Sequence, residues 1–330
     1  MISSVILGTG SNLPGDSVPN SSFTQFPAQM LSLIEEKTGI YRRHYVAKNQ
    51  STSDLALAAI DACLNSTCID RTDIDALIVA TSSPDYIHPP TAAVVQGKAG
   101  LINAFAFDIN SVCSGAIYAL QMADSLIKSN FCKRVMVVAA EAYSRFLDCN
   151  AINVYPYFGD GAGAVLLEGG SAIGSRRRSG ILHALLGTDG TKFETIIIPA
   201  GGARLPGPQC TNQSDFYFRM KGRDVFNFAI AKGSQIILQC LEEANVNLQE
   251  IDCVITHQAN INIIDGISKH TNIAREKFFV NLHKYGNTAA ASVLIALDEA
   301  FQTKKIGPGA LVLLVTFGGG LSWGAMLVRC

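Results

Sequence analysis

Cys113 is the residue whose type and position best suit covalent chemistry. It follows the apolar run Phe105 to Ile109 and precedes the helical pattern Ala116 to Leu120, so the sequence predicts a strand, a turn and a helix around it. A helix start offers unpaired N–H donors and partial positive charge, which lower the pKa of a thiol and favour the thiolate. We therefore expect Cys113 to be a nucleophile, and the alternative is a buried, unreactive thiol.

Other residues that could take part in catalysis lie in the second half of the chain. His257 follows the predicted buried strand 251–256, at the kind of strand end where α/β sheets present groups to ligands. Imidazole handles protons near neutral pH and donates hydrogen bonds to developing negative charge. Asn287 begins a predicted helix. A structural histidine and a simple N-cap are the alternative interpretations of these two residues.

A glycine-rich turn near the C-terminus supplies a further element. Phe317 is followed by Gly318, Gly319 and Gly320, and glycines permit a close approach of the backbone. An N–H exposed in so tight a turn can donate to an oxyanion together with the N–H of Cys113. Neither this run nor Gly8-Thr9-Gly10 has the spacing of a dinucleotide-binding or P-loop motif, so a nucleotide site is not favoured.

The two halves of the chain repeat the same order of segments. Asp75 and Asp252 start equivalent apolar runs, each after an amphipathic helix, beginning near Ser53 and near Gly222, and they lie 177 positions apart (252 − 75 = 177). Ala119 and Ala296 repeat that offset within the helices after Cys113 and Asn287. The runs starting at Phe158 and at Phe317 also match, at an offset of 159 (317 − 158 = 159), which predicts a deletion of about 18 residues between helix and turn.

The repeat predicts the fold. Short β-branched runs alternate with helical periodicity, as in layered α/β proteins. We expect two pseudo-symmetric halves, 1–172 and 173–330, in a five-layer αβαβα sandwich, with Gly169 to Phe216 as a connection that walls a pocket. Because Asn287 and Cys113 start equivalent helices, they should approach each other where the halves meet, with His257 at a neighbouring strand end.

Composition excludes several classes of protein. The 330 residues are 48% hydrophobic and 16% charged, with a formal net charge of -1, which favours a compact chain over a disordered or nucleic-acid-binding one. The only dense basic run, Arg176 to Arg178, is expected to be solvated surface. No apolar run is long enough for a membrane span and no signal peptide is recognisable, so the sequence predicts a cytoplasmic protein.

The nine cysteines follow no metal-binding or disulfide pattern. Their number is odd and no Cys-x-x-Cys pair occurs, so we expect reduced thiols, no disulfide framework and no metal site.

At these residues the sequence resembles the 3-oxoacyl-[acyl carrier protein] synthase III family of the thiolase superfamily, along essentially the whole chain. The matching segments are Gly8 to Ser11, Thr38 to Ile40, Val112 to Gly115, Phe158 to Gly163, His257 to Asn260, Gly286 to Thr288 and Phe317 to Gly320. The resemblance implies a thiolase fold, a homodimer and a catalytic triad of Cys113, His257 and Asn287. It implies no cofactor besides a coenzyme A thioester, which is a substrate.

The resemblance also implies a two-stage reaction. Cys113 takes an acyl group from acyl-CoA, and malonyl on an acyl carrier protein then loses carbon dioxide and attacks that acyl group. His257 and Asn287 hydrogen-bond the enolate oxygen, while the N–H groups of Cys113 and Gly319 hold the acyl oxyanion. Phe317 favours loss of the carboxylate. The product initiates fatty acid or related biosynthesis.

Several positions differ from the housekeeping pattern of the family. Leu33 and Ile152 stand where a tryptophan and an arginine sandwich the adenine of coenzyme A, although Lys37 keeps a positive charge nearby. Basic carrier-docking positions become Asn227 and Asn262, which leaves Arg223 and Lys269 as the expected contacts for an acidic carrier protein. Ser83-Pro84-Asp85 and Cys113-Ser114-Gly115 resemble relatives from secondary metabolism, which makes a specialised acyl donor an expectation.

Two alternatives remain open at this stage. One is a specialised relative that condenses an unusual donor or transfers the acyl group to an oxygen or nitrogen acceptor. The other is a catalytically silent partner subunit, which the intact triad disfavours.

Overall fold

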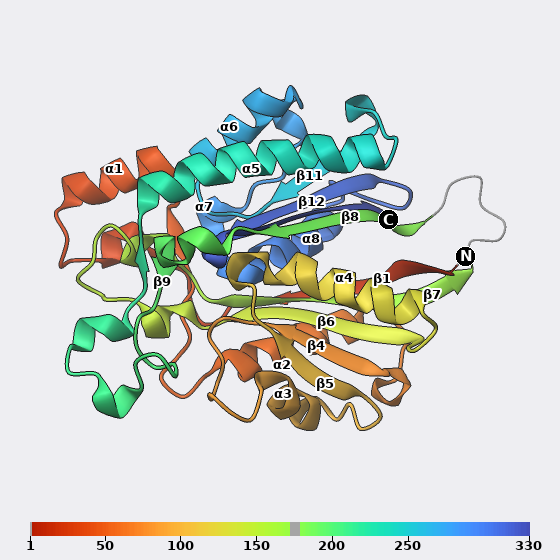
Figure 1. Cartoon of the computed structure of the whole chain (residues 1–330), viewed down its shortest axis with the longest axis horizontal. Coiled ribbons are helices and arrows are strands. Elements are labelled where there is room, and N and C mark those ends of the chain that lie inside the picture. Colours follow the sequence, from red (N-terminus) through yellow and green to blue (C-terminus); the bar gives the residue numbers. More distant parts are fainter. Residues whose placement is uncertain (1, 172–178) are drawn as a thin grey trace.

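The computed structural model describes residues 2–171 and 179–330, which form two mixed sheets stacked on each other (Figure 1). The first sheet has the strand order β1-β7-β6-β4-β5 and the second has the order β11-β12-β13-β8. The strands of the first are β1 (Ile2–Asn12), β4 (Ala76–Ala80), β5 (Phe105–Ile109), β6 (Arg134–Glu141) and β7 (Gly161–Ser171). Those of the second are β8 (Gly180–Thr188), β11 (Cys253–Thr256), β12 (Leu311–Gly318) and β13 (Ser322–Arg329). The basic run Arg176 to Arg178 lies outside the described residues.

Helices cover both sheets and fill the space between them. The central pair is α4 (Gly115–Lys128) and α8 (Ser292–Gln302), packed against apolar residues of both sheets. Helices α2 (Thr52–Asn65) and α3 (Thr91–Ala99) cover the outer face of the first sheet, and α5 (Gly222–Glu243) and α6 (Ile261–Thr271) cover the second (Figure 1). Helices α1 (Ala28–Thr38) and α7 (Leu282–Tyr285) flank this core. The predicted five-layer αβαβα sandwich is therefore confirmed.

Short strands and turns complete the fold. The pairs β2 (Val18–Pro19) with β3 (Arg42–Arg43) and β9 (Ile196–Ile197) with β10 (Arg219–Met220) form two small ribbons. Of the described helices, none is long and apolar enough to cross a membrane.

The repeat seen in the sequence extends to individual backbone angles. Strands β6 and β12 begin and end 177 positions apart (311 − 134 and 318 − 141). The 3-10 turns η3 (Val112–Ser114) and η11 (Ala289–Ala291), which precede α4 and α8, have the same spacing. Val112 and Ala289 open these turns with φ angles of 45° and 44°, a left-handed conformation that is uncommon for residues other than glycine. Both halves therefore enter their central helix through the same strained turn.

The deletion predicted between helix and turn is present, and it falls after the strand that follows the helix. The helix-to-strand spacing is kept, and the missing residues fall between strands, because 142–160 connect β6 to β7 whereas only 319–321 connect β12 to β13. Phe317 lies in β12, and Phe158 lies in the longer connection. The two phenylalanines are thus not equivalent, and their match reflected the glycines that follow each of them.

The predicted connection from Gly169 to Phe216 also needs correction. Residues 180–188 form β8, which pairs with β13 and completes the second sheet. The glycines and serines there indicated a loop, but pairing with β13 satisfies the backbone hydrogen bonds of this segment. The predicted domain boundary between 172 and 173 lies outside the described residues and stays a prediction.

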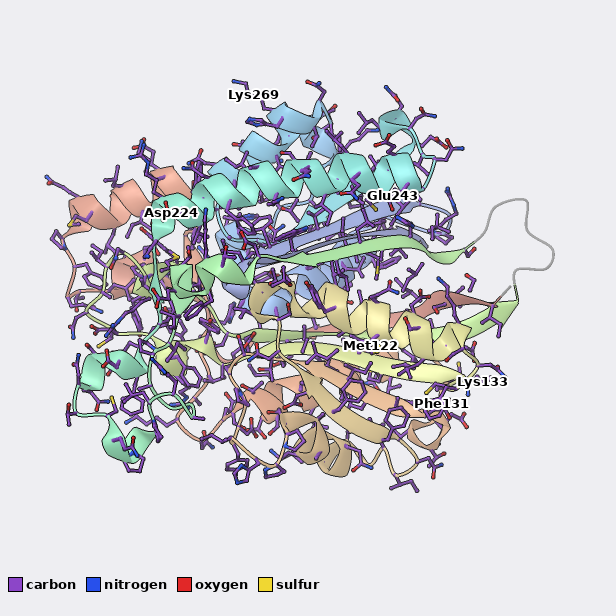
Figure 2. The ribbon with its side chains drawn as sticks, viewed as in Figure 1. Met122, Phe131, Lys133, Asp224, Glu243 and Lys269 are labelled. Atoms are coloured by element: carbon purple, nitrogen blue, oxygen red, sulfur yellow. The ribbon has the colours of Figure 1, made fainter. Side chains whose placement is uncertain are left out.

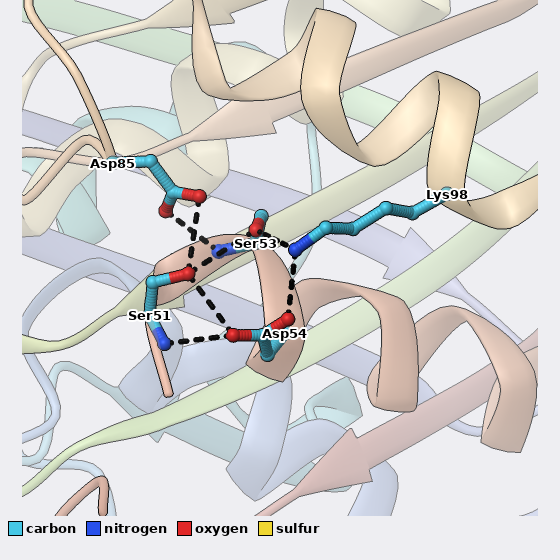
Figure 3. Close-up of polar contacts among 5 residues, drawn as sticks. All are labelled: Ser51, Ser53, Asp54, Asp85 and Lys98. Atoms are coloured by element: carbon cyan, nitrogen blue, oxygen red, sulfur yellow. Dashed lines mark hydrogen bonds and ion pairs between the residues drawn. The ribbon is translucent and has the colours of Figure 1, made fainter. Parts of the chain in front are cut away.

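The loop after β4 is anchored to the start of α2 (Figure 3). Ser51 caps this helix in a capping box with Asp54. The carboxylate of Asp85 accepts hydrogen bonds from the Ser53 N–H (2.9 Å) and the Ser51 hydroxyl (3.1 Å), and Lys98 bonds Ser53 and Asp54 at 2.8 Å each. A carboxylate is favourable at a helix N-terminus, so Asp85 fixes the loop that it belongs to.

The contact between α8 and β7 yields a stability prediction. A Cβ atom at Gly163 would lie 2.6 Å from the Leu294 Cβ and 2.8 Å from the Ile295 nitrogen, closer than real contacts allow. We expect Gly163→Ala to lower the free energy of unfolding in urea by about 1 to 3 kcal/mol through overpacking. Gly97→Ala, in an exposed helical position with nothing within 4 Å, is the control and should be neutral or slightly stabilising. Equal stability of both variants would contradict this packing.

Candidate active site

A cavity of about 250 Å³ lies where the two halves meet. Cys113 reaches it from the first half, on η3, while His257, Asn287, Phe317 and Gly318 reach it from the second. The cavity thus brings together the three residues that the sequence singled out as a triad. The start of α5 (Gly222, Val225 and Phe226) also lines it, as do Ile263 of α6 and Asn260, which caps α6.

Cys113 is held by the strained turn that precedes α4. The Asn110 side-chain oxygen accepts a hydrogen bond from the Val112 N–H at 3.2 Å and stabilises the left-handed residue. Only 7% of Cys113 is exposed. A Cβ atom at Gly318 would lie 2.8 Å from the Cys113 nitrogen, so a glycine is required there. The turn presents Cys113 to the cavity, with the β12 strand end directly against its backbone.

His257 directly follows β11, as predicted, and its main-chain N–H donates to the Val315 carbonyl at 2.7 Å. Its Nδ1 atom lies 2.7 Å from the Ser292 hydroxyl, which leaves Nε2 for a ligand in the cavity. Ser292 can accept from a protonated Nδ1 or donate to an unprotonated one, so it supports both tautomers. Burial lowers the pKa of His257 to about 3, and the imidazole is therefore neutral at physiological pH.

Asn287 is oriented by three hydrogen bonds. Its N–H donates to the Tyr157 carbonyl at 2.8 Å and its carbonyl accepts from the Gly159 N–H at 3.0 Å. The side-chain oxygen accepts from the Ala289 N–H at 2.9 Å, which repeats the Asn110 bond in the other half. Because this bond occupies the oxygen, the amide NH₂ is the group that Asn287 offers to the cavity as a donor.

Phe317 and the glycine turn complete the wall beside His257. The Phe317 ring meets the His257 ring edge to face, with centroids 5.4 Å apart. Gly318 lines the cavity, and Gly319 is buried at the start of η12 (Gly319–Leu321), where a Cβ atom would lie 3.1 Å from Val112. The backbone of this turn therefore packs beside Cys113, and the donor role of Gly319 stays a prediction.

The electrostatics of Cys113 differ from the sequence prediction. Burial raises the pKa of its thiol to about 12, and the nearby carboxylate of Glu141 adds to this effect. The helix start alone suggested a lowered pKa, but a fully desolvated thiolate costs more than the partial charge of one helix end returns. The resting nucleophile is accordingly a thiol, and attack on a substrate requires a proton acceptor.

The residues predicted to contact coenzyme A or a carrier protein lie at different distances from the cavity. Lys37 lines it and forms an exposed ion pair with Glu36 at 3.3 Å. Arg223 is exposed on the first turn of α5, next to the lining residue Gly222. Lys269 is exposed near the other end of α6, where Figure 2 shows it pointing away from the body of the protein.

Neither of the two substituted adenine positions lines the cavity. Leu33 is exposed on α1, and Ile152 packs against the apolar cluster of Phe23, Leu31 and Ile34.

Some residues of the site were given no role from the sequence. Phe158 and Phe218 line the cavity and meet edge to face with centroids 5.0 Å apart, and Phe158 stacks on Tyr143. Phe158 lies between β6 and β7 of the first sheet, and Phe218 lies directly before β10, so both are outside the helices and long strands that leave a periodic signal. Ser292 was also given no role, because its contact with His257, 35 residues earlier, forms only when the two elements pack together.

No group of three or more His, Cys, Asp or Glu residues suited to a metal ion occurs in residues 2–171 and 179–330. Among the polar groups that line the cavity, the Cys113 thiol, the His257 imidazole and the Asn287 amide suit acyl transfer.

The five layers and the meeting of Cys113, His257 and Asn287 at one cavity define a chain of the thiolase fold. Two family models match it. One describes 3-oxoacyl-[acyl-carrier-protein] synthase III and covers residues 107–190, and the other describes the C-terminal part of that enzyme and covers residues 241–330.

Full-length relatives agree with these matches. The chain is 40% identical to beta-ketoacyl-[acyl-carrier-protein] synthase III of Clostridioides difficile, over 98% of this chain and 97% of that one. It is 39% identical to the enzyme of the same name from Brucella anthropi, over the whole of both chains. The crystal structure of the Aquifex aeolicus 3-oxoacyl-[acyl-carrier-protein] synthase III superposes with a TM-score of 0.88 at 36% identity, covering 99% of this chain and 100% of that one. The chain belongs to the 3-oxoacyl-[acyl-carrier-protein] synthase III family of acyl-transferring condensing enzymes.

The raised pKa of Cys113 yields a prediction for its reaction with iodoacetamide. We expect the alkylation rate, followed by peptide mass spectrometry, to rise about tenfold per pH unit from pH 8 to pH 10, because only the thiolate reacts and its fraction grows tenfold per unit below the pKa. Cys68, which is exposed, is the internal comparison and should react faster at pH 8. A plateau in the Cys113 rate near pH 7 would contradict the dominance of burial.

Proposed function

We propose that this chain condenses an acyl group, carried as a thioester on Cys113, with malonyl on an acyl carrier protein and so initiates fatty acid biosynthesis. The observation that carries the proposal is the single cavity in which Cys113 from one half faces His257 and Asn287 from the other. A nucleophile on one side and hydrogen-bond donors on the other match the two stages of a decarboxylating condensation.

In the first stage the Cys113 sulfur attacks the acyl carbonyl of acyl-CoA. His257 is neutral and has Nε2 free of the Ser292 contact, so it accepts the thiol proton and passes it to the departing coenzyme A thiolate. The N–H groups of Cys113 and Gly319 donate to the oxyanion of the tetrahedral intermediate. Acyl-Cys113 and free coenzyme A result.

In the second stage malonyl thioester loses carbon dioxide, and the remaining enolate carbon attacks acyl-Cys113. The Asn287 amide donates to the thioester oxygen while it gains negative charge, and so does the His257 Nε2–H in the tautomer whose Nδ1 accepts from the Ser292 hydroxyl. Phe317, only 3% exposed, gives the malonyl carboxylate an apolar neighbour, which favours its conversion to neutral carbon dioxide. Cys113 leaves as a thiolate and takes up a proton from solvent to return to the resting thiol, and the carrier holds a 3-oxoacyl chain longer by two carbons.

Exposed basic side chains support the proposed partners. Lys37 lines the cavity and suits a phosphate of coenzyme A. Arg223 is exposed next to the lining residue Gly222, and Lys269 is exposed in the last turn of α6, farther from the cavity; both suit an acidic carrier protein. The nine cysteines are unpaired, which fits a reducing compartment such as the cytoplasm, and the reaction uses no cofactor besides the coenzyme A thioester.

Mass spectrometry of the intact protein tests this function. Incubated with a panel of acyl-CoAs, the chain should gain one acyl mass on Cys113, and added malonyl carrier protein should then remove it with release of carbon dioxide. Cys68→Ala, which changes an exposed thiol, is the control and should behave as the wild type. Absence of both the adduct and carbon dioxide with every donor would contradict the proposal. Discharge of the adduct to other acceptors without carbon dioxide would favour an acyl transferase instead.

The edge of the first sheet supports a homodimer. Strand β5 ends this sheet, and beside it Ile102 and Phe131 are each 72% exposed and Phe105 is 42% exposed. Phe105 and Phe131 meet with ring centroids 5.8 Å apart, and Figure 2 shows Phe131 at the end of α4 that also borders this edge. An unprotected edge strand with apolar neighbours pairs readily with another strand, and a second copy offers the same edge.

Light scattering after gel filtration tests the dimer. The wild type should have twice the mass of the 35.2 kDa chain, and Phe105→Glu with Phe131→Glu should elute as a monomer. Phe193→Glu, which changes a 55% exposed phenylalanine far from β5 in sequence, is the matched control and should remain dimeric. A monomeric wild type, or a dimer that survives the double substitution, would contradict this interface.

A further inference from the structure

The pseudo-symmetry places a second, altered copy of the active site inside the protein. Strand β12 lies against η3, and in the same way β6 lies against η11. Cys113 is therefore replaced in the second copy by Ala290 (290 − 113 = 177), and Gly318 is replaced by Glu141 (318 − 141 = 177). We call the surroundings of Glu141 and Ala290 the counterpart site.

Glu141 fills the counterpart site with a buried carboxylate. Its side chain is 0% exposed and accepts hydrogen bonds from the Ser82 hydroxyl at 2.8 Å, the Ser83 hydroxyl at 2.5 Å and the Ser82 N–H at 3.2 Å. The Ala290 N–H also donates to it. Hydrogen-bond donors from both halves, Ser82 and Ser83 of the first and Ala290 of the second, therefore bind this carboxylate.

The donors around Glu141 match groups that line the active cavity. Ser82 and Ser83 lie 177 positions before the lining residues Ala259 and Asn260, and the Ala290 N–H is equivalent to that of Cys113. The carboxylate oxygen of Glu141 therefore occupies, in the counterpart site, the position where the proposed mechanism places the acyl oxyanion.

The bond to Ala290 lies in the turn that carries Asn287. Asn287 bonds the Ala289 N–H through its side chain, the Ala291 N–H bonds the Thr288 carbonyl, and the Ala290 N–H between them bonds Glu141. Ala289 is in the strained left-handed conformation, which persists only where neighbours hold it. The loop that contains Ser82 and Ser83 is in turn anchored through Asp85 to α2 (Figure 3).

We propose that Glu141 is a positioning residue for the condensation: its carboxylate substitutes for a substrate oxygen in the counterpart site and, through Ala290, fixes the turn that aims Asn287 into the cavity. This inference rests on the proposed function, because it assigns Asn287 to the decarboxylation stage. It accounts for a carboxylate that is buried without an ion pair, an arrangement that is costly unless hydrogen bonds compensate it.

Glu141 also acts on its titratable neighbours, which among the described residues are Cys113 and Tyr143. Burial raises the pKa of Glu141 to about 7, and its negative charge contributes to the raised pKa of the Cys113 thiol and of the Tyr143 hydroxyl. Removal of this charge should therefore make Cys113 react at lower pH, whereas Glu141→Asp, which keeps the charge, should leave the pH profile of Cys113 unchanged.

The test compares Glu141→Gln and Glu141→Asp in separate assays of the two half-reactions. Glu141→Gln should slow carbon dioxide release from malonyl carrier protein at least tenfold while Cys113 acylation by acyl-CoA stays within threefold, and it should shift the pH profile of Cys113 alkylation downward. Glu141→Asp keeps the charge and should restore carbon dioxide release to within threefold of the wild type. Asp298→Asn is the matched control, because Asp298 is a buried carboxylate held by the hydroxyls of Thr9 and Ser11 away from the cavity, and it should leave both half-reactions unchanged.

The outcomes separate this inference from the proposed function. A wild type that neither acylates Cys113 nor releases carbon dioxide overturns both. A wild type that performs both half-reactions, together with a folded Glu141→Gln that matches it in carbon dioxide release and alkylation, overturns the role of Glu141 alone. If Glu141→Gln unfolds at the assay temperature, Ser82→Ala with Ser83→Ala, which removes two donors and keeps the charge, should show the same selective loss, and its absence overturns the inference.

Discussion

Each half of this protein ends a central strand against a strained turn of the other half, and the rest of the site depends on this crossed contact. Strand β12 meets η3, which carries Cys113, and β6 meets η11, which follows Asn287. The turns keep left-handed residues at Val112 and Ala289 only because asparagine side chains and the facing strand ends hold them. Neither half alone would hold its own turn in this way, so the nucleophile and its partners are positioned together.

The two copies of this contact have diverged in a chemically meaningful way. On one side a glycine at position 318 leaves room beside the Cys113 backbone, and the cavity is open to a substrate. On the other side Glu141 occupies the equivalent space and closes it. Burial governs the groups of the open side, since it keeps the Cys113 thiol protonated and the His257 imidazole neutral. The resting site therefore holds an uncharged thiol beside an uncharged imidazole, and Cys113 must give up its proton when a thioester enters.

Much of this arrangement was predictable from the sequence because the same apolar runs and helical periodicities occur in the same order in both halves. The offset of 177 predicted the layered fold and the approach of Cys113 to Asn287, since strands and helices leave periodic signals in both halves. The match of Phe158 to Phe317 paired residues that are not structurally equivalent, because glycine-rich turns have similar sequences at unrelated positions. Strand β8 was missed because its partner, β13, lies more than a hundred residues away in the chain.

The remaining features depend on tertiary contacts that no local pattern encodes. The pKa of Cys113 is set by burial under the other half, and the roles of Ser292 and Glu141 follow from contacts with segments distant in sequence. In the proposed reaction Cys113 is required for acylation and Asn287 for decarboxylation, so the two residues serve different stages of one reaction. Measuring Cys113 acylation and carbon dioxide release in Cys113→Ala and Asn287→Ala tests this division of roles most directly. We predict that Cys113→Ala abolishes acylation and keeps decarboxylation, whereas Asn287→Ala keeps acylation and loses decarboxylation about a hundredfold or more; loss of both activities in both folded variants would contradict the account.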